Sequence, residues 1–105
     1  MDIPEKDWKA LRQLKPILLN RLCEEILAGA TAIAQSNGNS HERYLRLFKY
    51  IREQDRELGE AFDDHRRSNA LLKITYLYSH KMITAEEFTL FSEETRQRVT
   101  FIIRL

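Results

Sequence analysis

Apolar residues recur every three or four positions over most of the chain, the spacing that places side chains on one face of an α-helix. A short stripe runs from Pro4 to about Leu14, and a longer one runs from about Pro16 to Gln35. Proline is well tolerated in the first turn of a helix, so Pro4 and Pro16 predict two separate helix starts. The apolar face of the second helix holds Leu19, Leu22, Cys23, Ile26, Leu27, Ala30, Ile33 and Ala34.

The segment 36–40, Ser-Asn-Gly-Asn-Ser, is the clearest turn in the sequence. Asn and Gly tolerate the left-handed backbone that ends helices, and Ser40 can cap the next helix. We therefore expect a hairpin of two long helices. A second helix running unbroken from His41 to His80 would be on the order of 60 Å long, more than a compact domain of this size. A break is therefore expected near Arg66 to Asn69.

Three further helices are predicted after this break. Residues 70–82 are apolar on most sides, which is typical of a helix in the centre of a bundle. Thr84 and Glu87 match a capping box, and Ser92 followed by two glutamates is a second helix start. Residues 99–105 are rich in β-branched and aromatic side chains, so they fit either a helix or a short edge strand.

These elements predict an all-α helical bundle with one long helical hairpin and a shorter C-terminal helical subdomain. The chain of 105 residues has room for one core, so we expect a single α-helical domain over residues 1–105. Only 3 Gly and 2 Pro interrupt it, which favours long helices. A hydrophobic content of 43% and a charged content of 31% suit a soluble globular protein.

The helix that follows the turn carries a heptad-like seam, in which steps of four and three residues alternate. Polar residues interrupt the seam, and a buried carboxylate without a partner is costly. The seam therefore either extends into solvent or pairs across an interface. Since polar seam positions set register and oligomeric state in coiled coils, we expect a homodimer. The candidate interface comprises Tyr44, Phe48, Ile51, Asp55, Leu58, Phe62 and His65.

Candidate catalytic chemistry is sparse. His65 follows two aspartates, yet no second His lies four residues away, and helical spacing predicts a surface ion pair between Asp63 and Arg67. The sequence has no Gly-rich phosphate loop or nucleophile elbow, and Cys23 reads as a small apolar residue. We assign no catalytic, cofactor-binding or metal-binding residue and expect no cofactor. A metal-dependent helical-bundle enzyme using His65 is the weakest alternative.

A basic strip on the second long helix offers another function, that of a nucleic-acid accessory protein. The net charge of only +1 does not indicate a polyanionic partner. Most of the basic residues also have an acidic residue four positions away, as in Glu42 with Arg46, and such pairs compensate one another on a helix surface. Nucleic-acid binding is therefore disfavoured. The strip consists of Arg43, Arg46, Lys49, Arg52 and Arg56.

A single cysteine excludes an intrachain disulfide and favours a reduced, cytoplasmic setting. No stretch approaches the roughly 20 apolar residues needed to cross a bilayer, so no membrane contact is expected. The sequence favours a small intracellular adaptor or regulatory protein without catalytic activity. It would act by helix-mediated protein–protein association, through the seam or through the small-residue face around Ala30.

Overall fold

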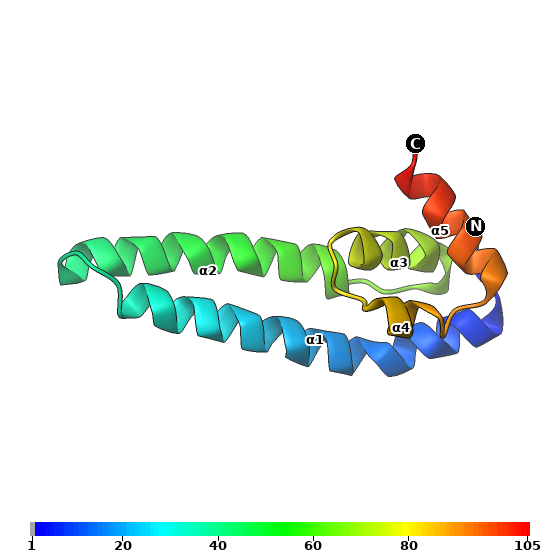
Figure 1. Ribbon diagram of the computed structural model, residues 1–105, viewed down its shortest axis with the longest axis horizontal. Coiled ribbons are helices and arrows are strands. Elements are labelled where there is room, and N and C mark those ends of the chain that lie inside the picture. The colour runs from blue at the N-terminus through cyan, green and yellow to red at the C-terminus, as the bar shows by residue number, and fades with distance from the viewer. Residues whose placement is uncertain (1) are drawn as a thin grey trace.

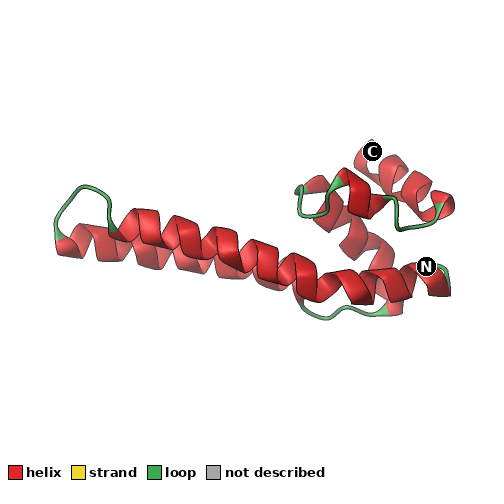
Figure 2. Ribbon diagram, turned by 60° about the horizontal axis from the view of Figure 1, so that its bottom comes forward, coloured by secondary structure: helices red, strands yellow, loops and turns green. Residues whose placement is uncertain are grey.

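Two long helices and four short ones make up the chain, for which a computed structural model describes residues 2–105 (Figure 1). No strand occurs in this range, and Figure 2 shows only helices and loops. The predicted all-α fold with a long hairpin and shorter C-terminal helices is confirmed, and residues 99–103 are helical. The elements are α1 (Glu5–Ala34), α2 (Ser40–Phe62), the 3-10 helix η1 (Arg67–Asn69), α3 (Ala70–Ser79), α4 (Ala85–Phe88) and α5 (Glu93–Ile103).

The hairpin of α1 and α2 makes the molecule elongated. It measures 52 × 25 × 22 Å, and its radius of gyration of 16.5 Å exceeds the ~13 Å of a compact 100-residue domain. No side chain between residues 23 and 60 is fully buried. We call residues 23–60 the arm and residues 2–22 with 61–105 the head. Both chain ends lie at the head, far from the turn between α1 and α2 (Figures 1 and 2).

The helix α1 continues through Pro16, so the prediction of two separate N-terminal helices is wrong. Proline removes one backbone hydrogen bond and strains the preceding turn, at a cost of about 3 kcal/mol. Here Pro16 is exposed, so water can reach the carbonyl group that lacks a partner. One buried stripe runs past it on both sides, and burying each leucine contributes about 1.5–3 kcal/mol. The stripe comprises Leu11, Leu14, Leu18 and Leu22.

The second long helix breaks as expected, but the break begins at Asp63 rather than near Arg66 to Asn69. The helix ends at Phe62, and Asp64 takes a left-handed conformation with φ 56°. The Asn69 side chain holds the turn, because it donates to the Asp64 carbonyl at 2.8 Å and accepts from the Arg66 N–H at 3.0 Å.

The surface ion pair predicted between Asp63 and Arg67 does not form. The two residues share no helix, because α2 ends before Asp63. Arg67 instead pairs with Glu5 at 2.8 Å.

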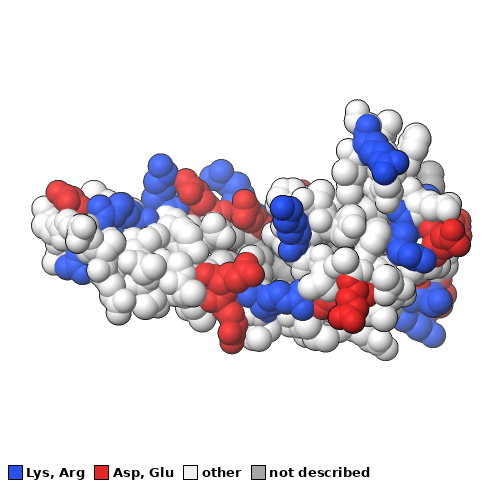
Figure 3. Space-filling view, viewed as in Figure 1, with Lys and Arg blue, Asp and Glu red and all other residues white. Residues whose placement is uncertain are grey.

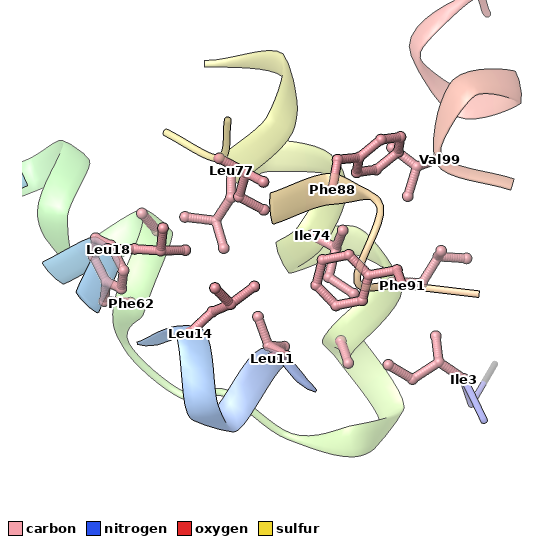
Figure 4. Packing of buried hydrophobic residues seen from close by; sticks show 14 of the residues in the cluster. Ile3, Leu11, Leu14, Leu18, Phe62, Ile74, Leu77, Phe88, Phe91 and Val99 are labelled. Atoms are coloured by element: carbon pink, nitrogen blue, oxygen red, sulfur yellow. The ribbon is translucent and has the colours of Figure 1, made fainter. Parts of the chain in front are cut away.

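The head core surrounds α3, as the sequence predicts. Ile74 and Leu77 of this helix are fully buried, and they face leucines of α1 on one side (Figure 4). On the other side lie Phe91 and Val99, from the C-terminal part of the chain. The C-terminal helices therefore cover only the base of the long hairpin.

A buried carboxylate ties α5 to α1. Asp7 accepts hydrogen bonds from the Ser92 N–H at 2.7 Å, the Ser92 hydroxyl at 2.6 Å and the Thr95 hydroxyl at 2.5 Å. Burial by itself would raise the pKa of Asp7, but the hydrogen bonds from Ser92 and Thr95 together hold this pKa below its ordinary value. Asp7 also lies at the N-terminus of α5, where the helix dipole favours a negative charge.

The predicted capping box at α4 forms and carries a second link to α1. The Thr84 hydroxyl accepts from the Glu87 N–H at 3.0 Å, and the Glu87 carboxylate accepts from the Thr84 N–H at 2.9 Å. Arg21 donates to both oxygens of the same carboxylate, at 3.0 and 2.7 Å. These contacts, the hydrogen bonds from Arg21 first, lower the pKa of Glu87 to about 2.

The two arm helices pack closely because α1 carries a glycine. A Cβ atom at Gly29 would lie 2.1 Å from the Tyr50 hydroxyl oxygen and 2.7 Å from the ring carbon that bears it. The tyrosine ring therefore rests on the backbone of α1. The small-residue face around Ala30, which the sequence offers as an alternative binding surface, is thus contacted at Gly29 by Tyr50 of α2 within the hairpin.

Replacing Glu87 by glutamine should make stability less sensitive to acid. A carboxyl group whose pKa falls from 4.5 to about 2 on folding stabilises the fold fully above pH 4.5, and this contribution is lost as the pH falls toward 2. Arg21 is 38% exposed, so solvent screens the pair and we expect Glu87→Gln to cost about 1 kcal/mol at pH 7.

Urea unfolding of wild type and Glu87→Gln at pH 7 and at about pH 3 measures this difference, which should shrink in acid. The neighbouring Glu86→Gln is the matched control, because Glu86 is exposed and makes no ion pair in the described range. An equal difference at both pH values would contradict the role of Glu87.

Gly29→Ala should destabilise the protein although alanine is the better helix former by about 1 kcal/mol. The added methyl group overlaps the Tyr50 ring and pushes it off α1. In a Tyr50→Ala background the overlap is gone, so the same substitution should become stabilising. Thermal unfolding of the four proteins of this double-mutant cycle gives the coupling, and a Gly29→Ala effect of the same sign in both backgrounds would refute the contact.

Candidate interaction surface on the arm

The structure divides the seven residues of the predicted interface between the arm and the head. Tyr44, Phe48 and Ile51 are 59%, 52% and 42% exposed, and Asp55 beside them is also exposed. The others are less accessible: Leu58 and His65 are half-buried, and Phe62 is buried in the head core.

These residues differ in exposure because the head covers only one end of the side of α2 on which they lie. Tyr44 and Phe62 are eighteen residues apart, about five helical turns, so they point in the same direction. At Phe62 the head covers this side, whereas at Tyr44 no other described element does. The contact of α2 with α1 is made from other positions on α2, because the half-buried Tyr50 lies against Gly29 of α1.

The arm helix α1 adds to the same surface. Leu27 is 65% exposed, and together with Cys23 and Ile26 it lines a groove of about 330 Å³ between the two helices. Ile51 and Asp55 lie on the α2 side of this groove. We call Leu27, Tyr44, Phe48, Ile51 and Asp55 the arm face. The sequence did not identify Leu27 as a member, because which residues of α1 and α2 lie side by side is set only when the hairpin forms.

Charges of both signs accompany the apolar residues of the arm face. The Arg52 guanidinium lies 5.7 Å from the centre of the Phe48 ring, which itself stacks on Tyr44 with 6.4 Å between ring centres. Asp55 supplies a negative charge one turn farther along the same side. Other Lys, Arg, Asp and Glu side chains follow α2 along the upper edge of the arm in Figure 3.

The basic strip does not form one continuous face. Arg43 donates to the Ala34 carbonyl at 2.6 Å, and Arg46 donates to the Ser36 hydroxyl at 2.8 Å and to the Asn37 carbonyl. These two arginines therefore close the hairpin at the C-terminal end of α1, where a helix dipole favours cations.

The ion pairs predicted within α2 do not form. The ion pairs in residues 2–105 are Arg21–Glu87, Arg66–Asp64 and Arg67–Glu5.

His65 lies apart from any cluster of metal-binding groups. Its Nε2 bonds to the Ala61 carbonyl at 2.7 Å, and its ring stacks on Phe62. No group of three or more His, Cys, Asp or Glu side chains within residues 2–105 is arranged to hold a metal ion. In the same range no helix combines the length and apolar character needed to cross a lipid bilayer.

The arm face is thus an accessible, largely apolar surface that is built from two helices and bears charges of both signs. No known protein family, curated protein or solved structure matches this chain.

Proposed function

We propose that this chain is a small cytoplasmic adaptor without catalytic activity that works by helix-to-helix association, and that its arm face packs against the arm face of a second copy. One observation carries the proposal. Four large apolar side chains, Leu27, Tyr44, Phe48 and Ile51, share one surface, and each is at least 42% exposed in the single chain. Completing the burial of such side chains is the main favourable term in association.

The shape of the arm face favours a second hairpin as its partner. A two-helix surface that packs on another two-helix surface forms a four-helix bundle, the common way for paired amphipathic helices to close a core. In a two-fold symmetric interface contacts are reciprocal, so that a residue of one copy that meets a second residue of the other copy is met by it in turn. Asp55 of one copy can therefore pair with Arg52 of the other, so the arm face carries its own complementary charges.

Association through the arm leaves the head outside the interface. A dimer would present two heads joined through a shared helical bundle. This is the arrangement expected of an adaptor that brings two identical binding surfaces together. The single free cysteine, half-buried in the groove, suits a reducing compartment.

Sedimentation equilibrium tests the proposal. Wild-type protein should fit a dimer, whereas Phe48→Asp and Leu27→Asp should weaken dimerisation at least about tenfold, because each places an unpaired carboxylate in an apolar interface. Both positions are exposed in the single chain, so the monomers should keep the wild-type circular dichroism spectrum.

Leu72→Asp is the matched control for Leu27→Asp. Leu72 lies on α3 in the head and is 63% exposed, compared with 65% for Leu27, so both variants put a charge on an exposed helical leucine. Dimerisation should survive in Leu72→Asp. A wild-type protein that stays monomeric at its highest soluble concentration would rule out self-association, as would equal weakening by the two substitutions.

A further inference from the structure

The head contains a pocket of about 330 Å³ that shares no residue with the arm face. It is lined by Trp8, Arg12, Lys15 and His65. The first three lie on one side of α1, because their spacings of four and three residues are those of a single helix face. His65 comes from the turn after α2, so the hairpin brings this residue to the pocket from fifty residues away.

The two permanent cations of the pocket have no acidic partner. Arg12 and Lys15 take part in none of the ion pairs within residues 2–105. Neither residue has an Asp or Glu three or four positions away along α1, where helix geometry would allow one to pair with it. Two uncompensated positive charges beside an indole ring therefore border the same cavity.

His65 can supply a third donor to this cavity. A carbonyl group only accepts hydrogen bonds, so the contact of Nε2 with the Ala61 carbonyl at 2.7 Å puts a proton on Nε2 and leaves Nδ1 to titrate. Burial is the largest influence and lowers the pKa of His65, as do the positive charges of Lys15 and Lys73, whereas the hydrogen bond to the Ala61 carbonyl and the charge of Asp63 raise it without reversing the shift. His65 is therefore neutral near pH 7 and gains a proton more easily when an anion is present.

Lys73 and Asp63 are the other charged groups that act on His65. Lys73 of α3 donates to the Glu60 carbonyl at 2.7 Å, at the C-terminal end of α2. The Asp63 carboxylate lies beside Gly59, where an oxygen is 3.1 Å from the position that a Cβ atom would take. The positive groups that line the pocket thus outnumber the one nearby carboxylate.

We propose that this pocket binds a phosphate monoester, with the phosphoryl oxygens held by Arg12 and Lys15 and the esterified group lying against the Trp8 indole. Guanidinium and ammonium groups are the usual protein partners of phosphate, and aromatic rings stack on flat ligand groups. The volume suits a small ligand. The site is independent of arm association, so a Phe48→Asp monomer should retain it.

Trp8 is the only tryptophan in the chain, so intrinsic fluorescence reports directly on the pocket. We would titrate the full chain with adenosine monophosphate, with inorganic phosphate and with adenosine. The nucleotide should give a saturable change, inorganic phosphate a weaker one, and adenosine none. Isothermal titration calorimetry provides a second readout that does not depend on light absorption by the nucleotide.

Substitutions distinguish binding in the pocket from a general attraction of the nucleotide to positive charge on the protein. Arg12→Gln and Lys15→Gln should each weaken nucleotide binding about tenfold, because each removes a charge-assisted hydrogen bond. Lys9→Gln is the matched control: it removes one charge from the same helix, but Lys9 lines a different groove. Lys9→Gln should bind like wild type, and circular dichroism checks that all three variants fold.

Sulfate tests the part played by His65, because phosphate itself takes up a proton near pH 6 whereas sulfate keeps its charge. Sulfate affinity should rise as the pH falls from about 8 to about 6, since a bound anion favours protonation of Nδ1. In His65→Gln this rise should disappear.

Several results would overturn the proposal. One is the absence of any fluorescence change or heat with both phosphate compounds. A second is adenosine binding as tightly as the nucleotide, which would show that stacking on Trp8 alone accounts for binding. A third is an equal loss of nucleotide affinity in Arg12→Gln, Lys15→Gln and Lys9→Gln, which would show a general attraction of anions to the protein. A sulfate affinity that does not depend on pH in wild type would exclude His65 from the site.

Discussion

Apolar burial in this protein is confined to the base of a hairpin that extends well past it. The chain after α2 is long enough to form α3, α4 and α5, and the core that these elements complete reaches along α1 only to about Ile26 and along α2 only from about Leu58. Ile26 and Leu58 still pack against the head core, and no arm side chain is fully buried. The uncovered stripe on the arm, and hence the proposed association, follows from this imbalance between helix length and covering chain.

Polar links between distant parts of the sequence hold the head to the hairpin. Asp7 reaches Ser92, 85 residues away, and Arg21 reaches Glu87, 66 residues away. Both acids also lie at helix starts, where they bond N–H groups that have no partner within their helix. These links hold α5 and α4 on one side of α1, and the cationic pocket lies on a neighbouring side, where Trp8, Arg12 and Lys15 meet His65.

The two candidate sites differ in what the sequence reveals of them. The apolar stripe of Tyr44, Phe48 and Ile51 is visible from residue spacing alone, because helix periodicity is a local property. The exposure of this stripe cannot be predicted from residue spacing, because Phe62 lies on the same side of α2 and is buried. The pocket is hidden from the sequence for another reason: Trp8, Arg12 and Lys15 share a helix face, but nothing local indicates that His65 joins them.

The sequence by itself determined the features that depend on hydrogen bonds between near neighbours, such as the turn at 36–40, the Thr84–Glu87 capping box and the cap at Ser92. The cap of α2 is the exception, because Asn39 and not Ser40 accepts from the Glu42 N–H. Tertiary structure decided whether α1 passes through Pro16, because the leucines buried on both sides outweigh the bond that proline removes. It also decided which part of each amphipathic face stays in water. That outcome depends on contacts between residues far apart in the chain, and local propensity carries no information about them.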